Sequence, residues 1–282
     1  MAVDANAVIS GITKIAALPD VAVKFNDAIQ NPLTSNQDLE NIISEDSALA
    51  SRVLRISNSA IYSFPSKIDT ISKALNIIGQ NEVRDIIFAC SIINSFKNVP
   101  ETSLNMEQFW RHNLAVAVAS RLIASLRREN NVERYFLAGL LHDLGRLILL
   151  VERPGIMGKV FASFEASGGY LYAEEKKEMG FCHSDIAALL LKKWRFPKAI
   201  IESVRYHHNP SSAGEYIIPA GIVHIADIIA HAVKLGESGE RNVPILDEKA
   251  WGFVAVDIDD IDYIFDQLCI QYEEAVKYIL GE

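Results

Sequence analysis

The sequence predicts an all-α fold, a bundle of helices packed around an apolar core. Apolar residues recur three and four positions apart along most of the 282-residue chain, which is the spacing of one helix face. No stretch alternates apolar and polar residues convincingly enough to predict a strand. Half of the residues are hydrophobic and 22% are charged, proportions typical of a packed globular protein.

Short helices with start and stop signals fill the first hundred residues. Oxygen-bearing side chains and one glycine flank the apolar runs where a helix needs caps, and they are Ser35 with Asp38, Asp46, Thr70 and Gly79. Gly79 is expected to close the run before it in a left-handed conformation. The later of these predicted helices cover residues 48–56, 71–78 and 82–96.

Longer helices are predicted in the remainder of the chain. They cover residues 107–126, 132–151, 185–194, 197–208 and 217–235. Glycine, proline and polar residues predict loops at 168–169, 209–215 and 236–244. The polar segment 98–105, which contains Pro100, predicts a boundary between an N-terminal helical part at 8–100 and a second helical part at 106–282.

Charge and cysteine usage narrow the class of protein. A formal net charge of -9 argues against nucleic-acid binding by bulk electrostatics. The three cysteines, Cys90, Cys182 and Cys269, are far apart and odd in number, so the sequence suggests neither a disulfide framework nor a thiolate zinc site. A reducing cytoplasm fits this pattern best.

Targeting and membrane-spanning segments are not expected. The first residues lack the basic start and apolar core of a signal peptide. The apolar stretch at 138–151 is interrupted by His142, Asp143 and Arg146, and it is shorter than the ~20 residues that span a bilayer. We therefore expect a cytoplasmic protein without a membrane or nucleic-acid partner.

Histidines and carboxylates occupy positions in the second half where helices would otherwise show apolar residues. His112 shares the apolar face of its helix with residues one and two turns later, such as Val116 and Ala119. His142 has small neighbours on its own face, which leave space beside its ring. Asp143 follows it directly, so the pair can approach one centre from two directions.

Four further residues extend this pattern. His183 lies near the predicted start of a helix, and His207 with His208 closes another. Asp227 lies within an apolar helix, where burying an unpaired carboxylate would cost more than the helix could offset. Each of these buried polar groups therefore needs a partner.

Together these residues indicate a metal site. Imidazole nitrogens and carboxylate oxygens are ligands that Zn, Mn and Fe(II) accept, and we expect a divalent transition metal, with two ions. The candidate ligands are His112, His142, Asp143, His183, His207, His208 and Asp227. Taken singly, each has an ordinary explanation, such as a hydrogen-bonded core histidine or, for His207, a helix C-cap. Without a metal, each of the seven residues would need its own explanation, and this favours a metal site.

The order of these residues resembles the HD superfamily, and more closely the ligand set of the HD-GYP phosphodiesterases, which hold two or three metal ions. The resemblance implies that the seven positions correspond to metal ligands. It also implies a catalytic role for Asp143, and for Arg146 in the motif HDLGR, where that family has a phosphate-contacting lysine.

Two departures argue against recognition of cyclic di-GMP. Gln108, a neutral amide, lies four residues before His112, where HD-GYP enzymes can supply a bridging glutamate. The neighbouring Glu107 lies on another face of the helix. The sequence after His208 also lacks the HHExxxGxGYP motif of those enzymes.

The first half resembles HDOD modules, which are bacterial signalling and regulatory units, many of which have lost the HD ligands. The resemblance covers about residues 8–235. It rests on segments at 17–19, 38–39, 43–49, 52–55, 58–62, 71–79 and 83–84. It implies an HD-domain-like helical bundle with an N-terminal helical subdomain.

Two functions follow as expectations. The first is a bacterial signal-transduction protein with a retained HD-type metal site, whose partner is a regulatory protein or a phosphorylated small ligand. The alternative is a metal-dependent phosphohydrolase or phosphodiesterase acting on a nucleotide-like substrate, with Arg146 pairing with phosphate. His224 and His231 share the helix face of Asp227, and we expect them to support ligands or the core and not to bind metal.

Overall fold

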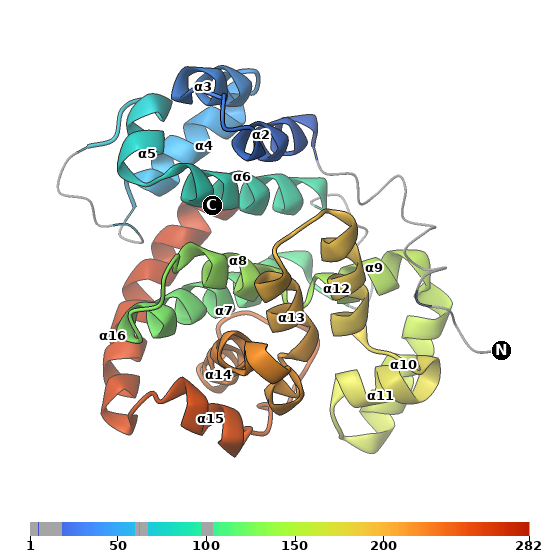
Figure 1. Cartoon of the computed structure of the whole chain (residues 1–282). Helices are drawn as coiled ribbons and strands as arrows, with labels where there is room; N and C mark the ends of the chain where they lie inside the picture. The colour runs from blue at the N-terminus through green and yellow to red at the C-terminus, as the bar shows by residue number, and fades with distance from the viewer. Residues whose placement is uncertain (1–4, 6–18, 60–61, 63–66, 97–103, 282) are drawn as a thin grey trace. The chain divides into compact units, whose positions relative to one another are not determined.

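The computed structural model describes residues 5, 19–59, 62, 67–96 and 104–281. Within these ranges every regular element is a helix and no strand occurs, which confirms the predicted all-α fold (Figure 1). The described residues divide into two compact units. The small unit comprises residues 19–96 with 266–281, and the large unit comprises residues 104–265.

The small unit contains short helices around an apolar core that includes Phe25, Leu39 and Val53. Its elements are α2 (Asp20–Gln30), α3 (Asn36–Ser44), α4 (Ser47–Ser57), α5 (Ile71–Ile77), α6 (Gln80–Ser95), the end of α16 (Ile258–Ala275) and η3 (Val276–Leu280). Helix α6 is buried along most of its length and contacts α2, α4 and α5. The unit therefore packs around α6.

The predicted caps of the small unit form. Ser35 and Asp38 make a reciprocal capping box, Asp46 accepts from the amides of the next helix, and Thr70 caps α5. Gly79 differs from the prediction: its φ is positive at 112°, but its ψ of 154° is extended, not left-handed helical. Gly79 is the N-cap of α6, so its backbone conformation belongs to the start of that helix and not to the end of α5.

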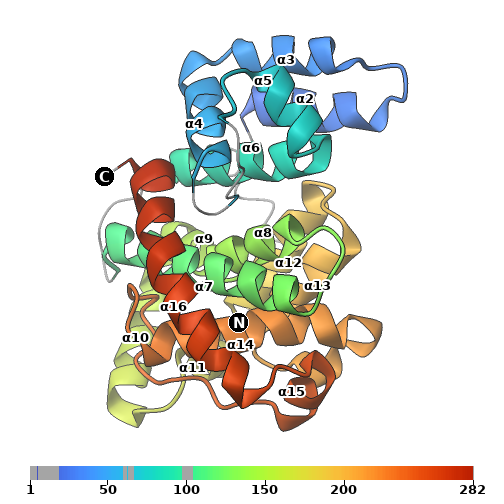
Figure 2. The same ribbon diagram turned by 90° about the vertical axis from the view of Figure 1, so that its left-hand side faces the viewer.

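The large unit is a bundle in which α7, α8 and α14 lie side by side (Figure 2). Its longer helices are α7 (Met106–Leu126), α8 (Glu133–Leu141), α9 (Leu144–Glu152), α10 (Pro154–Ser167), α11 (Leu171–Met179), α12 (His183–Lys193), α13 (Lys198–Tyr206), α14 (Ile217–Ala232) and α15 (Glu248–Val254). The short helices η1 (Pro210–Ser212) and η2 (Gly214–Tyr216) precede α14, and the first part of α16 completes the unit.

The predicted helix at 132–151 is wrong in one respect, because the chain breaks it into α8 and α9 at His142 and Asp143. Close packing of α9 accompanies this break. A Cβ atom on Gly145 would collide with the carbonyl oxygen of His183, so this glycine lets α9 approach the start of α12 closely. The break places His142 and Asp143 in a turn between two helices.

Helix α14 is the core helix of the large unit. In the described part of the chain, one segment, Gly214–Ala232, is long and apolar enough to cross a membrane by length and composition. The sequence predicted a helix at 217–235, but it was residues 138–151 that were compared with the length of a membrane span. However, 61% of it is buried within the molecule, and it contacts α7, α13 and α15. Burial against these helices accounts for its apolar composition.

Two findings concern the predicted division of the chain into residues 8–100 and 106–282. Most of the proposed linker, and the motif residues at 17–18 and 60–61, lie outside the described residues. Residues 266–281 group with the small unit, although the sequence placed them with the second part. Val276 and Ile279 of η3 are buried, and η3 contacts α4 and α6.

Candidate metal centre

Seven sequence-predicted ligands come together in the large unit, and most lie at helix ends. His142 and Asp143 form the turn between α8 and α9, and His183 is the first residue of α12. His207 and His208 follow the end of α13. His112 and Asp227 project from within α7 and α14, the two central helices. All but His208 are buried, and His208 is partly buried.

Asp227 forms one focus of the cluster. Its Oδ1 lies 3.2 Å from His112 Nε2, 2.9 Å from His231 Nδ1 and 3.7 Å from His142 Nε2. Three imidazole rings therefore surround one carboxylate oxygen. His231, which the sequence analysis expected to support a ligand, can form a three-donor group with His112 and Asp227.

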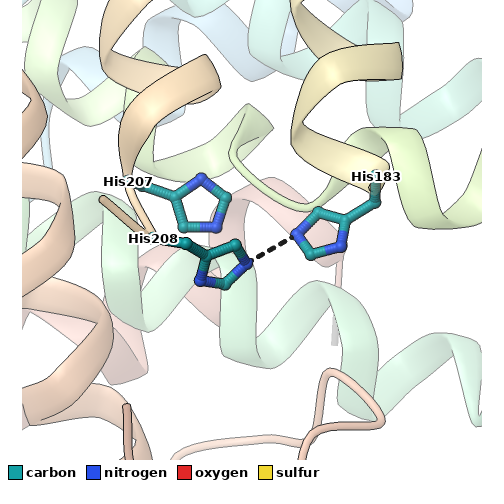
Figure 3. Close-up of side chains that lie close together, drawn as sticks. All are labelled: His183, His207 and His208. Atoms are coloured by element: carbon teal, nitrogen blue, oxygen red, sulfur yellow. Dashed lines mark hydrogen bonds between the residues drawn. The ribbon is translucent and has the colours of Figure 1, made fainter. Parts of the chain in front are cut away.

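Asp143 forms the second focus. Its Oδ1 lies 2.8 Å from His183 Nε2, and its Oδ2 lies 3.6 Å from His142 Nε2. His183 Nε2 is also 3.0 Å from His208 Nε2, as Figure 3 shows together with the adjacent ring of His207. Because His142 reaches toward both aspartates, the two foci belong to one continuous set of donors.

Backbone carbonyl groups orient two of the rings. His142 Nδ1 lies 2.6 Å from the carbonyl oxygen of Gly139, and His207 Nδ1 lies 2.7 Å from that of Val204. A carbonyl oxygen can only accept a hydrogen bond, so each Nδ1 carries the proton and each Nε2 keeps its lone pair. This arrangement leaves Nε2 available to a metal ion, and it is common in metal sites.

Several donor atoms in the cluster are buried without a hydrogen-bond partner. They are both ring nitrogens of His112, His207 Nε2, Asp227 Oδ1 and His231 Nε2. His231 Nδ1 and His112 Nε2 lie 2.9 and 3.2 Å from Asp227 Oδ1, within ion-pair distance, but neither contact is aligned as a hydrogen bond. Unsatisfied buried polar atoms cost about 1–3 kcal/mol each, so a set of them needs an explanation. Divalent cations would engage one ring nitrogen of His112, His207 Nε2 and Asp227 Oδ1, which belong to the three-donor groups of the cluster, and these residues fit such ions.

The pKa shifts of His112 and of the two aspartates favour the protonation states that bind metal, whereas neighbouring carboxylates outweigh burial and raise the pKa of His183 and of His231. Burial lowers the pKa of His112 to about 4, which keeps this ring neutral. Burial alone would raise the pKa of Asp227, but the neighbouring His231 and His112 rings hold it well below the ordinary value. Burial opposes ionisation of Asp143 in the same way, and Arg146 outweighs it. Neutral imidazoles and ionised carboxylates are the forms that coordinate metal.

Arg146 lies in a closed network and is only 1% exposed. Its Nη1 donates to Asp143 Oδ2 at 2.6 Å and to the carbonyl oxygen of Ser238 at 2.8 Å. Its Nε donates to Glu175 Oε1 at 3.3 Å. The guanidinium is therefore occupied by the protein itself, although the sequence suggested a contact with phosphate.

Glu175 is a site residue that the sequence analysis missed. It is fully buried in α11, and its Oε2 accepts from the backbone amide of His183 at 2.8 Å and from His183 Nδ1 at 2.6 Å. In the sequence, Glu175 lies in a run of polar residues that is typical of a solvent-exposed helix face. The available signal was Arg146, since a buried guanidinium requires a carboxylate partner.

The segment 236–244, here called the strap, covers one side of the cluster. A cavity of about 10 Å³ lies between the metal-site residues and a rim formed by Tyr170, Tyr172, Glu240 and Pro244. Tyr172 also stacks on His208, with ring centroids 4.1 Å apart. A space of this size holds about one water molecule.

Hydrogen bonds hold the strap in place at several points. Ser238 accepts from Arg146, and the Glu240 carboxylate accepts from the Leu171 amide at 2.6 Å. Asn242 Nδ2 donates to the carbonyl oxygen of Gly169 at 2.6 Å. These contacts join the strap to α9 and to the turn between α10 and α11.

Comparison with known protein families identifies the chain. The model of the HDOD domain matches residues 15–210, which is more than half of the sequence. The chain is a member of the HDOD domain family. The match includes six of the seven clustered candidate ligands, and Asp227 lies beyond its end.

Solved structures share the fold of this HDOD protein. An HDOD domain protein from Geobacter sulfurreducens is 24% identical, with a TM-score of 0.79, and the alignment covers 98% of this chain and 96% of that one. A protein from Shewanella amazonensis SB2B, named "Putative phosphohydrolase", is 23% identical, with a TM-score of 0.75 and coverage of 97% and 98%. At these identities the similarity shows the fold.

A longer relative comes from Treponema pallidum (strain Nichols). It is 24% identical over 210 residues, which is 73% of this chain. The aligned region makes up 40% of that protein, so this HDOD chain spans less than half of its relative's length.

Proposed function

We propose that this HDOD protein is a bacterial, cytoplasmic signal-transduction protein in which a divalent-metal centre stabilises one conformation of the large unit. The ion or ions would be held by His112, His142, Asp143, His183, His207, His208 and Asp227. The observation that carries the proposal is the set of buried donor atoms without partners, centred on His112, His207 and Asp227.

Charge supports a cation at this position. Asp143, Asp227 and Glu175 are buried carboxylates, whereas Arg146 is the buried guanidinium among them. In the metal-free protein a protonated His231 ring offsets part of this negative charge, and a bound divalent cation would take over that role. Four overlapping three-donor groups occur in the described cluster, which supports two ions of Fe, Mn or Zn.

The location of the donors suggests what the metal would do. The donors come from the ends of α8, α12 and α13 and from the middle of α7 and α14. An ion bound to all of them would tie these helices together and add its binding free energy to the stability of the folded state. A regulatory protein or a phosphorylated small ligand that binds this conformation would then depend on the metal.

A metal-dependent phosphohydrolase acting on a nucleotide-like substrate is the second candidate. The complete donor set favours it, and a Shewanella amazonensis SB2B protein of the same fold is named "Putative metal-dependent phosphohydrolase". When bound, such ions polarise a phosphoryl oxygen and lower the pKa of a coordinated water. Asp143 would hold metal, and Arg146 would pair with phosphate only after releasing Ser238 of the strap. The cavity of about 10 Å³ favours the regulatory function.

Elemental analysis tests the metal centre directly. Protein purified anaerobically without chelators is expected to contain at least one equivalent of transition metal, and Asp143→Ala is expected to remove it. Asp262→Ala, at an exposed carboxylate of the same unit, is the matched control and should retain the metal. Sub-stoichiometric metal in wild-type protein from metal-replete medium contradicts the proposal. Assays on phosphomonoesters, phosphodiesters and nucleotides then separate the two candidate functions.

A further inference from the structure

A second and much larger cavity lies beside the metal centre within the large unit. Its volume is about 540 Å³, within the range of small-molecule sites. The start of α7, one face of α10, the end of α14 and the strap form its walls. The function proposed above does not use this cavity.

One part of the cavity wall is apolar. Leu104, Phe161, Phe164 and Val243 line it. Phe161 is partly exposed and offers a face on which a ring or a branched aliphatic group can pack, and Phe164 lies on the same helix, buried with the Arg241 guanidinium over its ring. A ligand with an apolar body of that size would therefore bury surface here.

Some charged side chains that line the cavity already have partners within the protein, and others do not. Arg241 is paired with Glu165, and the Glu240 carboxylate accepts from the amides of Leu171 and Arg241. In the described part of the chain, Lys234 and Glu237 line the same cavity with exposed side chains that make no ion pair or side-chain hydrogen bond. One ammonium and one carboxylate thus remain open to a ligand.

We propose that this cavity binds a small zwitterion with an apolar or aromatic body, of the amino-acid type. The ligand carboxylate would pair with Lys234, its ammonium with Glu237, and its side chain would pack on Phe161 and Phe164. Three glutamates line the cavity together with Lys234, Arg241 and His231. This balance of charge suits a ligand that carries one charge of each sign.

The cavity also touches the metal centre through one residue. His231 lines both cavities, and its Nδ1 lies 2.9 Å from Asp227 Oδ1. A ligand that displaces the His231 ring would change the surroundings of Asp227. Binding to the cavity does not depend on metal, so this inference goes beyond the proposed function.

Titration of the full-length protein with three probes of matched shape tests the proposal. L-phenylalanine is a zwitterion, phenethylamine is a cation and phenylacetate is an anion, and all carry the same ring. Calorimetry or NMR on metal-free protein is expected to show that L-phenylalanine binds about fivefold or more tightly than either singly charged probe, since each partly exposed ion pair contributes modestly. The metal-free condition excludes chelation of a metal ion by the amino acid.

Charge variants locate the site. Lys234→Gln and Glu237→Gln are each expected to weaken L-phenylalanine binding about threefold to fivefold. Glu178→Gln, at an exposed glutamate of α11 outside the cavity, should leave it unchanged. Absence of binding by all three probes, equal binding of the three, or an equal effect of the control variant overturns the proposal. These outcomes are independent of whether the protein proves to contain metal.

Discussion

The carboxylate of Glu175 accepts hydrogen bonds from both the backbone amide and the ring Nδ1 of His183, at 2.8 and 2.6 Å. This double contact fixes the ring and directs Nε2 toward the Asp143 carboxylate, 2.8 Å away. Glu175, which was not among the candidate ligands, thus sets the position of the candidate ligand His183.

Glu175→Gln is therefore expected to weaken metal retention by about 10- to 100-fold, as loss of an orienting group typically does. The glutamine amide is neutral and leaves the Arg146 guanidinium without its second carboxylate. Competition with a chromogenic chelator measures the affinity, and Glu178→Gln serves as the control. Unchanged affinity in Glu175→Gln would show that His183 is oriented by other contacts.

Substituting His231 with Gln should weaken metal retention less than substituting His208 with Gln. His231 Nδ1 contacts the Asp227 carboxylate, whereas His208 Nε2 points to His183 Nε2 within a group of three histidines. A glutamine at 231 can still donate to Asp227, but a glutamine at 208 is a poor substitute for imidazole. Metal content after dialysis against a weak chelator ranks the two variants, and equal losses contradict this order.

Gln108→Glu tests whether the centre is a weakened hydrolase. The residue lies one turn before His112 on α7, and it lines the larger cavity together with His231. A carboxylate here would add a hard oxygen donor, so metal occupancy or turnover of a model phosphodiester should rise. Any wild-type hydrolysis should be slow and should favour generic diesters or nucleotides over cyclic di-GMP.

The opposite result for Gln108→Glu has a definite meaning. If wild-type and variant proteins are both fully metallated and both inert toward phosphomonoesters, diesters and nucleotides, the enzyme function is wrong. The regulatory function then stands alone.

In metal-free protein, the pair formed by His231 and Asp227 should make stability depend on pH. Burial lowers the pKa of His231, but the Asp227 carboxylate outweighs it and raises the pKa to about 9. Because the folded pKa exceeds the unfolded value of about 6.5, the contribution is full below that pH and is lost as pH rises through about 9.

Denaturation of chelator-treated protein between pH 6 and pH 10 measures this dependence. His231→Gln removes the titrating group, so its stability should fall less steeply than that of wild type over this interval. Parallel curves for the two proteins would show that the pair does not contribute.

Local features of the sequence predicted the helical fold and the candidate metal ligands. Apolar spacing and the caps at Ser35, Asp46 and Thr70 depend on residues three to four positions apart, so they can be read without the fold. His112 and Asp227 stood out because polar side chains on an apolar helix face need partners.

Only the tertiary structure decided how these parts meet. The predicted helix ends at His142, next to the close contact of Gly145 with the start of α12, and Glu175 reaches His183 from a helix with a polar sequence. The strap closed over the cluster through Ser238, which is 92 positions from Arg146. Each of these features depends on packing between segments distant in sequence, and neither periodicity nor capping encodes such contacts.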